Sequence, residues 1–289
     1  MRKFSLCFFL GLSLALLQAC PKPKEAAQTL TLPDGAKIAY ESRGSGETTL
    51  LFIHCWSCNR RYWDSAMAEL SKHFRVVALD LRGHGESDRG RKDLKVADLA
   101  QDVDELIKQL KLNRVVLVGS SMGGSVSLAA AKDNPGTVVG VVCVDTLHNV
   151  EMKFPQEMME NFVKSLERDF AAGIAKFMPA VFAKDADPKL IAWTAEQASK
   201  TDPQAAVSLI KDLFALDVRP WMSAVKVPIR CLNSDSSPPL GVKTSVEVNR
   251  KYADFDVVEL QGSGHLPQLE RPEEFNRKLR ETVEGLLKN

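Results

Sequence analysis

The chain has 289 residues, of which 45% are hydrophobic and 26% are charged, and its formal net charge is +1. This composition is that of an ordinary globular protein, and the length suits one α/β unit with an insertion. The sequence has no basic stripe or acidic tail of the kind that binds nucleic acid, so we exclude nucleic acid as a partner.

The first 19 residues are predicted to be a secretory signal rather than part of the fold. Arg2 and Lys3 give it a positive start, and an apolar run over residues 4–17 follows. That run is too short to span a membrane comfortably. It ends at Leu17-Gln18-Ala19-Cys20, directly before a stretch rich in proline and lysine.

This ending resembles the lipobox of bacterial lipoproteins, in which the cysteine becomes the lipidated first residue after cleavage. The resemblance implies removal of residues 1–19 and a lipid on Cys20. Residues 20–28 would then tether the domain to the membrane of the bacterial cell envelope, with the periplasmic face as the favoured location. An ordinary secretory signal with a chance cysteine near its end is the alternative.

Short apolar segments alternate with helix-like segments along the rest of the chain. Strands are expected over residues 29–32, 36–41, 49–54, 75–80, 115–118, 138–144, 227–232 and 256–260, and helices over 61–74, 96–110, 125–132 and from Pro272 onward. Several of the strands are continuous apolar runs, as strands buried on both faces require. This order predicts an α/β fold: a mostly parallel, eight-stranded sheet with helices on both faces, built from residues 29–148 and 219–289.

Between residues 149 and 218 the alternation stops, and the pattern is helical and rich in phenylalanine and methionine. This segment follows the sixth predicted strand. Active sites of open α/β sheets lie at the carboxyl ends of the strands, so the insertion begins beside the expected site. We therefore predict a helical lid; an extra core layer without a functional role is the alternative.

The run Gly119-Ser120-Ser121-Met122-Gly123 follows a predicted strand directly and opens a helix of small residues. A strand–turn–helix context is what a G-x-S-x-G nucleophile elbow requires. The sharp turn would present Ser121 Oγ above the sheet, near a helix N-terminus that favours developing negative charge. The sequence therefore predicts that Ser121 is the nucleophile of a serine hydrolase.

A serine nucleophile needs a base, and the chain has five histidines. His265 lies in a glycine-rich loop just after the last predicted strand, from which it can reach back over the sheet ends. His54 and His84 each precede a tight turn and are expected to hold loops, whereas His73 is expected to be solvated. His148 is a candidate for the pocket wall at the entrance to the lid. We predict His265 as the base.

From Leu30 to Leu287 the chain resembles the α/β-hydrolase fold family. The resemblance rests on the serine elbow, on Gly264-His265, and on the runs Phe52-Ile53-His54 and Asp80-Leu81-Arg82-Gly83-His84-Gly85-Glu86-Ser87. It does not specify a substrate, because the family includes esterases, lactonases, cofactor-free haloperoxidases and carbon–carbon bond hydrolases. The serine argues against the family's haloalkane dehalogenases and epoxide hydrolases, which use an aspartate nucleophile.

The acid that orients His265 has two candidates. The resemblance implies an acid after the seventh strand, but that position falls on Ser237, and Asp235 comes two residues early. Some family members place the acid directly after the sixth strand, where this chain has Asp145. We favour Asp145, which keeps the chain order Ser, Asp, His, and retain Asp235 as the alternative. Capping the first turn of the lid is the other role open to Asp145.

The resemblance also implies two backbone donors for the oxyanion, the N–H groups of Met122 and Trp56. The family pattern in the second loop is His-Gly-x, but this chain has His54-Cys55-Trp56. Glycine tolerates unusual dihedral angles, so we expect Cys55 to strain the loop.

Cys55 and Cys58 form a Cys-x-x-Cys pair. A lone pair without further cysteine or histidine ligands is not a metal site, and we favour free thiols over a disulfide here. Cys143 and Cys231 lie in apolar strand-like runs and are expected to be buried thiols.

The leading hypothesis is an exported, lipid-anchored hydrolase of small or medium apolar esters or related acyl compounds, with no metal or organic cofactor. A small-molecule sensor on the same fold is the rival from another class, because Cys55 and the missing acid at Ser237 depart from the family pattern. Carbon–carbon bond hydrolysis or cofactor-free haloperoxidase chemistry on the same triad is a further alternative.

Overall fold

The computed structural model describes residues 27–89, 91–235 and 242–288. The predicted signal, Cys20, most of the tether and Ser237 lie outside these residues. Within the described part of the chain, no helix is long and apolar enough to cross a membrane.

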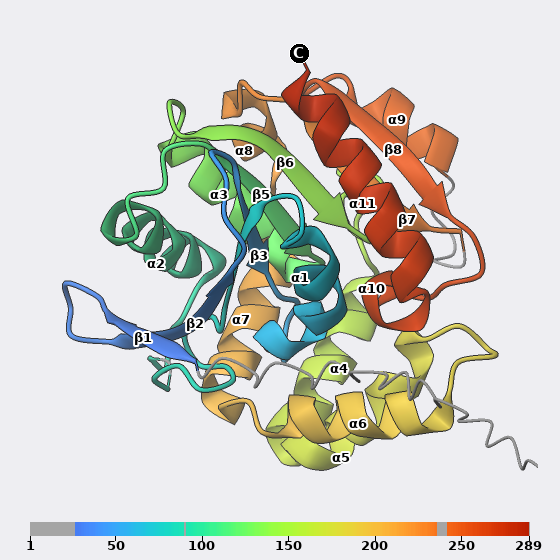
Figure 1. Ribbon diagram of the computed structural model, residues 1–289. Helices are drawn as coiled ribbons and strands as arrows, with labels where there is room; N and C mark the ends of the chain where they lie inside the picture. The colour runs from blue at the N-terminus through green and yellow to red at the C-terminus, as the bar shows by residue number, and fades with distance from the viewer. Residues whose placement is uncertain (1–26, 90, 236–241, 289) are drawn as a thin grey trace, which may run out of the picture.

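Eight strands form one sheet in the order β1-β2-β4-β3-β5-β6-β7-β8 (Figure 1). Their bounds are β1 Gln28–Thr31, β2 Lys37–Arg43, β3 Thr49–Ile53, β4 Arg75–Leu79, β5 Val115–Ser120, β6 Val138–Val144, β7 Ile229–Ser234 and β8 Phe255–Leu260. β2 pairs antiparallel with β1 and with β4, and all other pairs are parallel. The predicted fold class is confirmed.

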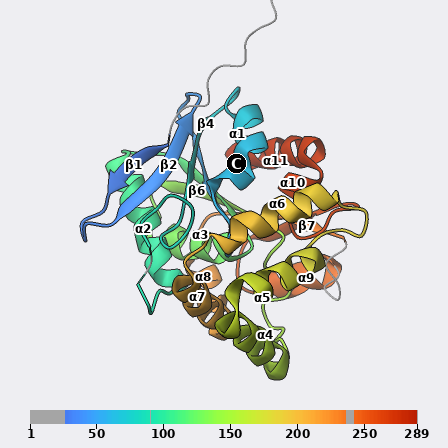
Figure 2. The ribbon, with the colours of Figure 1, turned by 90° about the horizontal axis from the view of Figure 1, so that it is seen from below.

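Helices cover both faces of the sheet (Figures 1 and 2). On one face, α2 (Val96–Gln109) and α3 (Met122–Asp133) share an apolar cluster with alternate residues of β3 and β5, including Leu51 and Leu117. On the other face, α1 (Asp64–Leu70) and α11 (Pro272–Leu287) pack on the intervening residues. Every side chain of β3 and β5 is buried, which explains why these strands are continuous apolar runs.

The segment between β6 and β7 is helical, as predicted. It contains α4 (Gln156–Arg168), α5 (Phe170–Phe177), the 3₁₀ helix η2 (Met178–Val181), α6 (Pro188–Ser199), α7 (Pro203–Ala215) and α8 (Arg219–Ala224), together called the insert below. The side chains of Asp169, Asp187 and Asp202 cap α5, α6 and α7 by accepting backbone N–H bonds. In Figure 1, α4, α5 and α6 lie at the end of the sheet toward which the arrows of β6, β7 and β8 point.

Two predicted helices differ in their bounds. The helix expected over residues 61–74 is a 3₁₀ turn, η1 (Arg60–Trp63), followed by α1, which ends at Leu70. The helix expected from residue 125 begins three residues earlier, at Met122. Nothing therefore separates Ser121 from a helix N-terminus. Two short elements complete the described fold, α9 (Val242–Asn249) and α10 (Pro267–Glu270).

Candidate active site

Ser121 occupies a sharp turn between β5 and α3. Its backbone has φ 51° and ψ −116°, a conformation that costs energy for any residue with a Cβ and persists only where its surroundings hold it. The Ser121 N–H donates to the Val144 carbonyl at 2.9 Å, and the Ser121 carbonyl accepts from Gly124 N at 2.9 Å. The turn is thus fixed to the end of β6 on one side and to α3 on the other.

The two glycines of the motif are required by close backbone approach. A Cβ on Gly119 would lie 2.2 Å from the Gly123 carbonyl oxygen, and a Cβ on Gly123 would lie 2.3 Å from the Ile53 carbonyl oxygen. Real Cβ atoms do not come this close to backbone oxygens, so only glycine fits at either position. The second contact also presses the end of β3 against the turn that carries Ser121.

Asp145 follows β6 and is fully buried, whereas 32% of the His265 side chain is exposed. Asp145 Oδ2 lies 2.5 Å from His265 Nδ1, and Asp145 Oδ1 accepts from the Ser234 N–H at 2.9 Å. An ionised carboxylate can only accept, so we assign the proton of the first hydrogen bond to Nδ1. Nε2 of His265 is then the nitrogen that can accept a proton.

The charges of this pair reinforce each other. Burial acts to raise the pKa of Asp145, but the neighbouring His148 ring and the hydrogen bond with His265 outweigh burial and hold that pKa far below its usual range. Burial acts to lower the pKa of His265, but the Asp145 carboxylate outweighs it, so the pKa of His265 is raised. His148, predicted for the pocket entrance, lies with Nε2 3.6 Å from Asp145 Oδ1. The buried aspartate therefore stays ionised and favours the charged form of His265.

Asp235, the alternative acid, has a different partner. Its Oδ1 accepts from the Gly262 N–H at 2.9 Å, and its own N–H donates to the Leu260 carbonyl at 3.0 Å. These contacts tie Asp235 to the turn after β8. The structure thus places Asp145, and not Asp235, against Nδ1 of His265.

The loop that carries His265 is bound to the insert. The His265 N–H donates to the Val181 carbonyl at 2.7 Å. A Cβ on Gly264 would lie 2.6 Å from the Val181 carbonyl oxygen, so glycine is needed for this approach. The sequence does not reveal this contact, because nothing in the local pattern at residue 181 indicates a partner 84 residues later.

Glu270 is a second residue of this region that was not predicted from the sequence. Its Oε1 accepts from the N–H groups of Gly264 at 3.0 Å and Leu266 at 3.3 Å, and its Oε2 accepts from Ala183 N at 2.9 Å. One carboxylate therefore brackets His265 and joins its loop to the insert. The one available signal in the sequence was an acidic residue, Glu270, shortly after the loop that carries His265.

These features fit the comparison with known proteins. The model of the alpha/beta hydrolase family matches residues 50–278. This chain belongs to the alpha/beta hydrolase family. The matched range contains β4 to β8, all of β3 but its first residue, and the whole insert, whereas β1 and β2 precede it.

The relatives of this α/β hydrolase are distant. A pimeloyl-(acyl-carrier protein) methyl ester esterase of Proteus mirabilis is 23% identical over 86% of this chain and 98% of that protein. The karrikin insensitive 2 receptor CA of Petunia hybrida is 23% identical over 80% of this chain and 89% of its own length. A solved structure of a thermophilic esterase from Thermogutta terrifontis superposes with a TM-score of 0.80 at 24% identity, over 91% of this chain and 99% of that one. At this identity the structural likeness shows the fold alone.

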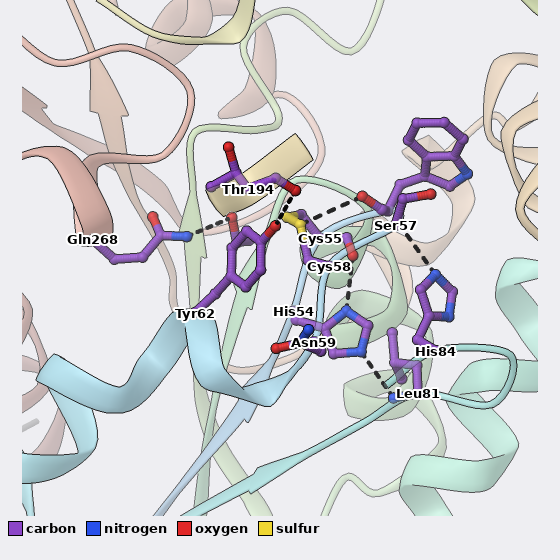
Figure 3. Close-up of a disulfide and its surroundings, with 12 residues drawn as sticks. His54, Cys55, Ser57, Cys58, Asn59, Tyr62, Leu81, His84, Thr194 and Gln268 are labelled. Atoms are coloured by element: carbon purple, nitrogen blue, oxygen red, sulfur yellow. Dashed lines mark hydrogen bonds between the residues drawn. A yellow bond between two sulfur atoms is a disulfide. The ribbon is translucent and has the colours of Figure 1, made fainter. Parts of the chain in front are cut away.

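The loop after β3 of this α/β hydrolase is held by two buried histidines, as expected (Figure 3). His54 Nε2 accepts from Leu81 N at 2.9 Å, so its Nδ1 carries the proton that is shared with the Cys55 carbonyl at 2.8 Å. His84 Nε2 accepts from Ser57 N at 3.2 Å. Burial lowers the pKa of His54 to about 4 and that of His84 to about 3, so both rings are neutral acceptors at neutral pH.

The expected oxyanion donors lie on this loop and on the elbow. Met122 is the first residue of α3, and Trp56 lies three residues beyond Ile53, the residue that contacts Gly123. Among the described residues, neither the Trp56 N–H nor the Met122 N–H has an acceptor. The Trp56 side chain reaches into the insert, where its Nε1 donates to the Ala206 carbonyl at 2.8 Å. Its ring packs against three phenylalanines of α4 and α5: Phe162, Phe170 and Phe177.

Two expectations for this loop were wrong. Cys55 and Cys58 form a disulfide rather than free thiols. The reason is a turn in which Cys58 N donates to the Cys55 carbonyl at 3.1 Å and brings the two Cα atoms to 5.3 Å, within disulfide range. The strain expected at Cys55 falls instead on Ser57, which has φ 54°. Cys143 and Cys231 are buried free thiols, as predicted.

Proposed function

We propose that this α/β hydrolase cleaves small or medium apolar esters, or related acyl compounds, through an acyl-enzyme on Ser121. The observation that carries the proposal is the 2.5 Å contact between buried Asp145 and partly exposed His265. It supplies an oriented, charge-stabilised base at the strand ends where the strained turn presents Ser121.

In the first half of the reaction, Ser121 Oγ attacks the ester carbonyl while His265 Nε2 takes its proton. The carbonyl electron pair moves to oxygen, and the N–H groups of Trp56 and Met122 stabilise that oxyanion. When the oxyanion collapses, the bond to the leaving oxygen breaks and His265 returns the proton to it. An alcohol leaves, and the acyl group stays on Ser121.

In the second half, His265 takes a proton from water, and the water oxygen attacks the acyl carbon. Collapse of the second tetrahedral intermediate returns the proton to Ser121 Oγ and releases a carboxylic acid. Asp145 keeps its charge throughout and stabilises the imidazolium form of His265 in both halves.

The insert supports an apolar substrate and a role as a lid. Trp56, next to the proposed oxyanion donor, packs against phenylalanines of α4 and α5. These aromatic side chains beside the proposed oxyanion donor favour an apolar acyl group. The name of the Proteus relative, a methyl ester esterase, agrees with ester hydrolysis.

The decisive experiment is labelling with a fluorophosphonate probe, followed by mass spectrometry of the modified peptide. The proposal expects one label, on Ser121, and turnover of short-chain p-nitrophenyl esters that Ser121→Ala abolishes. Modification at another residue, or ester turnover that survives Ser121→Ala, would overturn it.

A small-molecule sensor is the second candidate, favoured by the similarity to the Petunia receptor. In that case purified protein would bind an apolar ligand tightly and turn it over slowly. Steady-state turnover well above one per minute on several p-nitrophenyl esters would exclude the sensor and leave the esterase.

For location, we propose export and lipid attachment at Cys20. The support is the sequence alone, a positive start, an apolar run and a lipobox-like ending. Metabolic labelling with an alkyne fatty acid tests it: the natural sequence should be labelled and found with membranes, and Cys20→Ser should be unlabelled. Labelling that persists in Cys20→Ser would contradict the proposal.

A further inference from the structure

The disulfide between Cys55 and Cys58 encloses Trp56 and Ser57, and no step of the proposed reaction uses it. Trp56 is the proposed oxyanion donor. Ser57 has φ 54°, a conformation that a residue with a Cβ holds only when its surroundings enforce it. The covalent ring therefore closes around the two residues whose backbone geometry matters most in this loop.

Hydrogen bonds hold the backbone of the residues on either side of Trp56 but not the Trp56 N–H itself. His54 binds the Cys55 carbonyl, and His84 binds the Ser57 N–H. The Trp56 N–H between them has no acceptor among the described residues. The direction of the Trp56 N–H is therefore set by the backbone on either side of it. Within the described loop, the disulfide is the one covalent cross-link that constrains this backbone.

The disulfide also fills the space between three parts of the site. Cys55 and Cys58 are 5% and 4% exposed. They share an apolar cluster with Tyr62, with Leu266, the residue after His265, and with Phe182, the residue after Val181. Figure 3 shows the sulfur atoms beside Tyr62. The bridge therefore lies where the oxyanion loop, the base loop and the insert meet.

We propose that the Cys55–Cys58 disulfide is a positioning group for the oxyanion donor, so that full hydrolytic activity requires the oxidised pair. This inference rests on the proposed function. A ring of four residues restricts little of the unfolded chain, so its main effect is local. Reduction lowers kcat by about tenfold, a fraction of the loss that follows complete removal of one oxyanion donor, and leaves KM within about twofold because ground-state binding is unchanged.

The redox step needs a co-reactant, a dithiol reductant. The dithiol gives two electrons and two protons, the S–S bond breaks, two S–H bonds form, and the dithiol becomes a cyclic disulfide. If the chain is exported as proposed, the pair stays reduced in the cytosol and is oxidised outside it. The enzyme would then reach full activity only after export.

The test compares oxidised and reduced full-length protein in detergent. Reduction under native conditions is followed by mass spectrometry after alkylation, and kcat and KM are measured on p-nitrophenyl butyrate. Binding of an aryl boronic acid is a second readout, because its adduct with Ser121 places an oxygen in the oxyanion hole. We expect kcat to fall about tenfold, the boronate to bind more weakly, and reoxidation to restore both.

Cys55→Ala/Cys58→Ala provides the same test without a reductant. It should show the reduced kcat with or without dithiol, and an unchanged circular dichroism spectrum. Cys231→Ala is the matched control, since it removes a buried thiol from β7 and keeps the disulfide; it should retain wild-type kcat and the sensitivity to dithiol.

The inference is overturned if reduced protein, with both thiols shown by mass, keeps kcat within twofold of the oxidised form. It is also overturned if the double variant folds and loses no activity. Failure of the proposed function looks different: the oxidised natural protein would neither hydrolyse esters nor react with fluorophosphonate at Ser121.

Discussion

The side chains of His265 and Asp145 are in contact although they follow strands that are not neighbours in the sheet. Asp145 follows β6 and His265 follows β8, with β7 between these strands in the sheet, yet Nδ1 and Oδ2 lie 2.5 Å apart. The end of β7 supports the pair, because Ser234 N donates to the other carboxylate oxygen. Asp145 itself has a left-handed backbone conformation, with φ 44°, at the point where its side chain contacts His265.

The first prediction concerns the two aspartates. Asp145→Asn should lower kcat on p-nitrophenyl esters by about 10³- to 10⁴-fold, because the amide cannot stabilise the imidazolium and favours the wrong tautomer of His265. Asp235→Asn is the matched control and should keep kcat within about twofold, since Asp235 contacts the turn after β8. Near-full turnover by Asp145→Asn would show that the acid lies elsewhere.

A second prediction concerns Glu270. Its carboxylate accepts three backbone N–H bonds around His265 and raises the pKa of that histidine. Glu270→Gln removes the charge, so the acid limb of the kcat/KM profile should move to lower pH, and kcat should fall by about tenfold through poorer placement of the loop. The exposed Glu273→Gln should change neither. An unshifted acid limb in Glu270→Gln would contradict an electrostatic role.

The third prediction is a loss of stability in acid. The folded pKa values of about 4 for His54 and about 3 for His84 lie below the unfolded value of 6.5. Between these limits the unfolded state binds more protons, so the free energy of unfolding falls as the pH falls, by up to about 1.4 kcal/mol per pH unit for each histidine. Urea unfolding between pH 4.5 and 7 measures this slope.

His84→Gln isolates one of these protons. The glutamine Oε1 can take the place of Nε2 and accept from Ser57 N, but the side chain does not titrate in this range. The variant should therefore show a shallower dependence of unfolding free energy on pH than the natural protein. An equal slope would mean that His84 does not supply the proton.

A fourth prediction tests the packing of the elbow. Gly123→Ala would place a Cβ 2.3 Å from the Ile53 carbonyl oxygen, and relief requires moving β3 or α3, at a cost of about 3 kcal/mol or more. Gly136→Ala is the matched control, because its Cβ would meet nothing within 4 Å, and it should change stability by less than about 0.5 kcal/mol. Chemical denaturation measures the free energy of unfolding of both variants. An equal change in the two would contradict the close approach of Gly123 to Ile53.

The elbow and the sheet could be predicted from the sequence because their signals are local. Apolar runs give β3 and β5, and glycines on both sides of Ser121 mark a turn. The partner of His265 could only be narrowed to two aspartates, since the choice depends on how loops after β6, β7 and β8 fold together. The disulfide was missed because Cys-x-x-Cys spacing does not reveal whether a turn brings the Cα atoms close.

The hydrogen bond from His265 N to the Val181 carbonyl has a consequence for substrate entry. The histidine loop and η2 are joined there and again through Glu270, so a movement that lifted η2 off the sheet would displace the histidine with it. With η2 displaced, the protein would lack an aligned base, and an acyl group on Ser121 would not be hydrolysed until η2 returned.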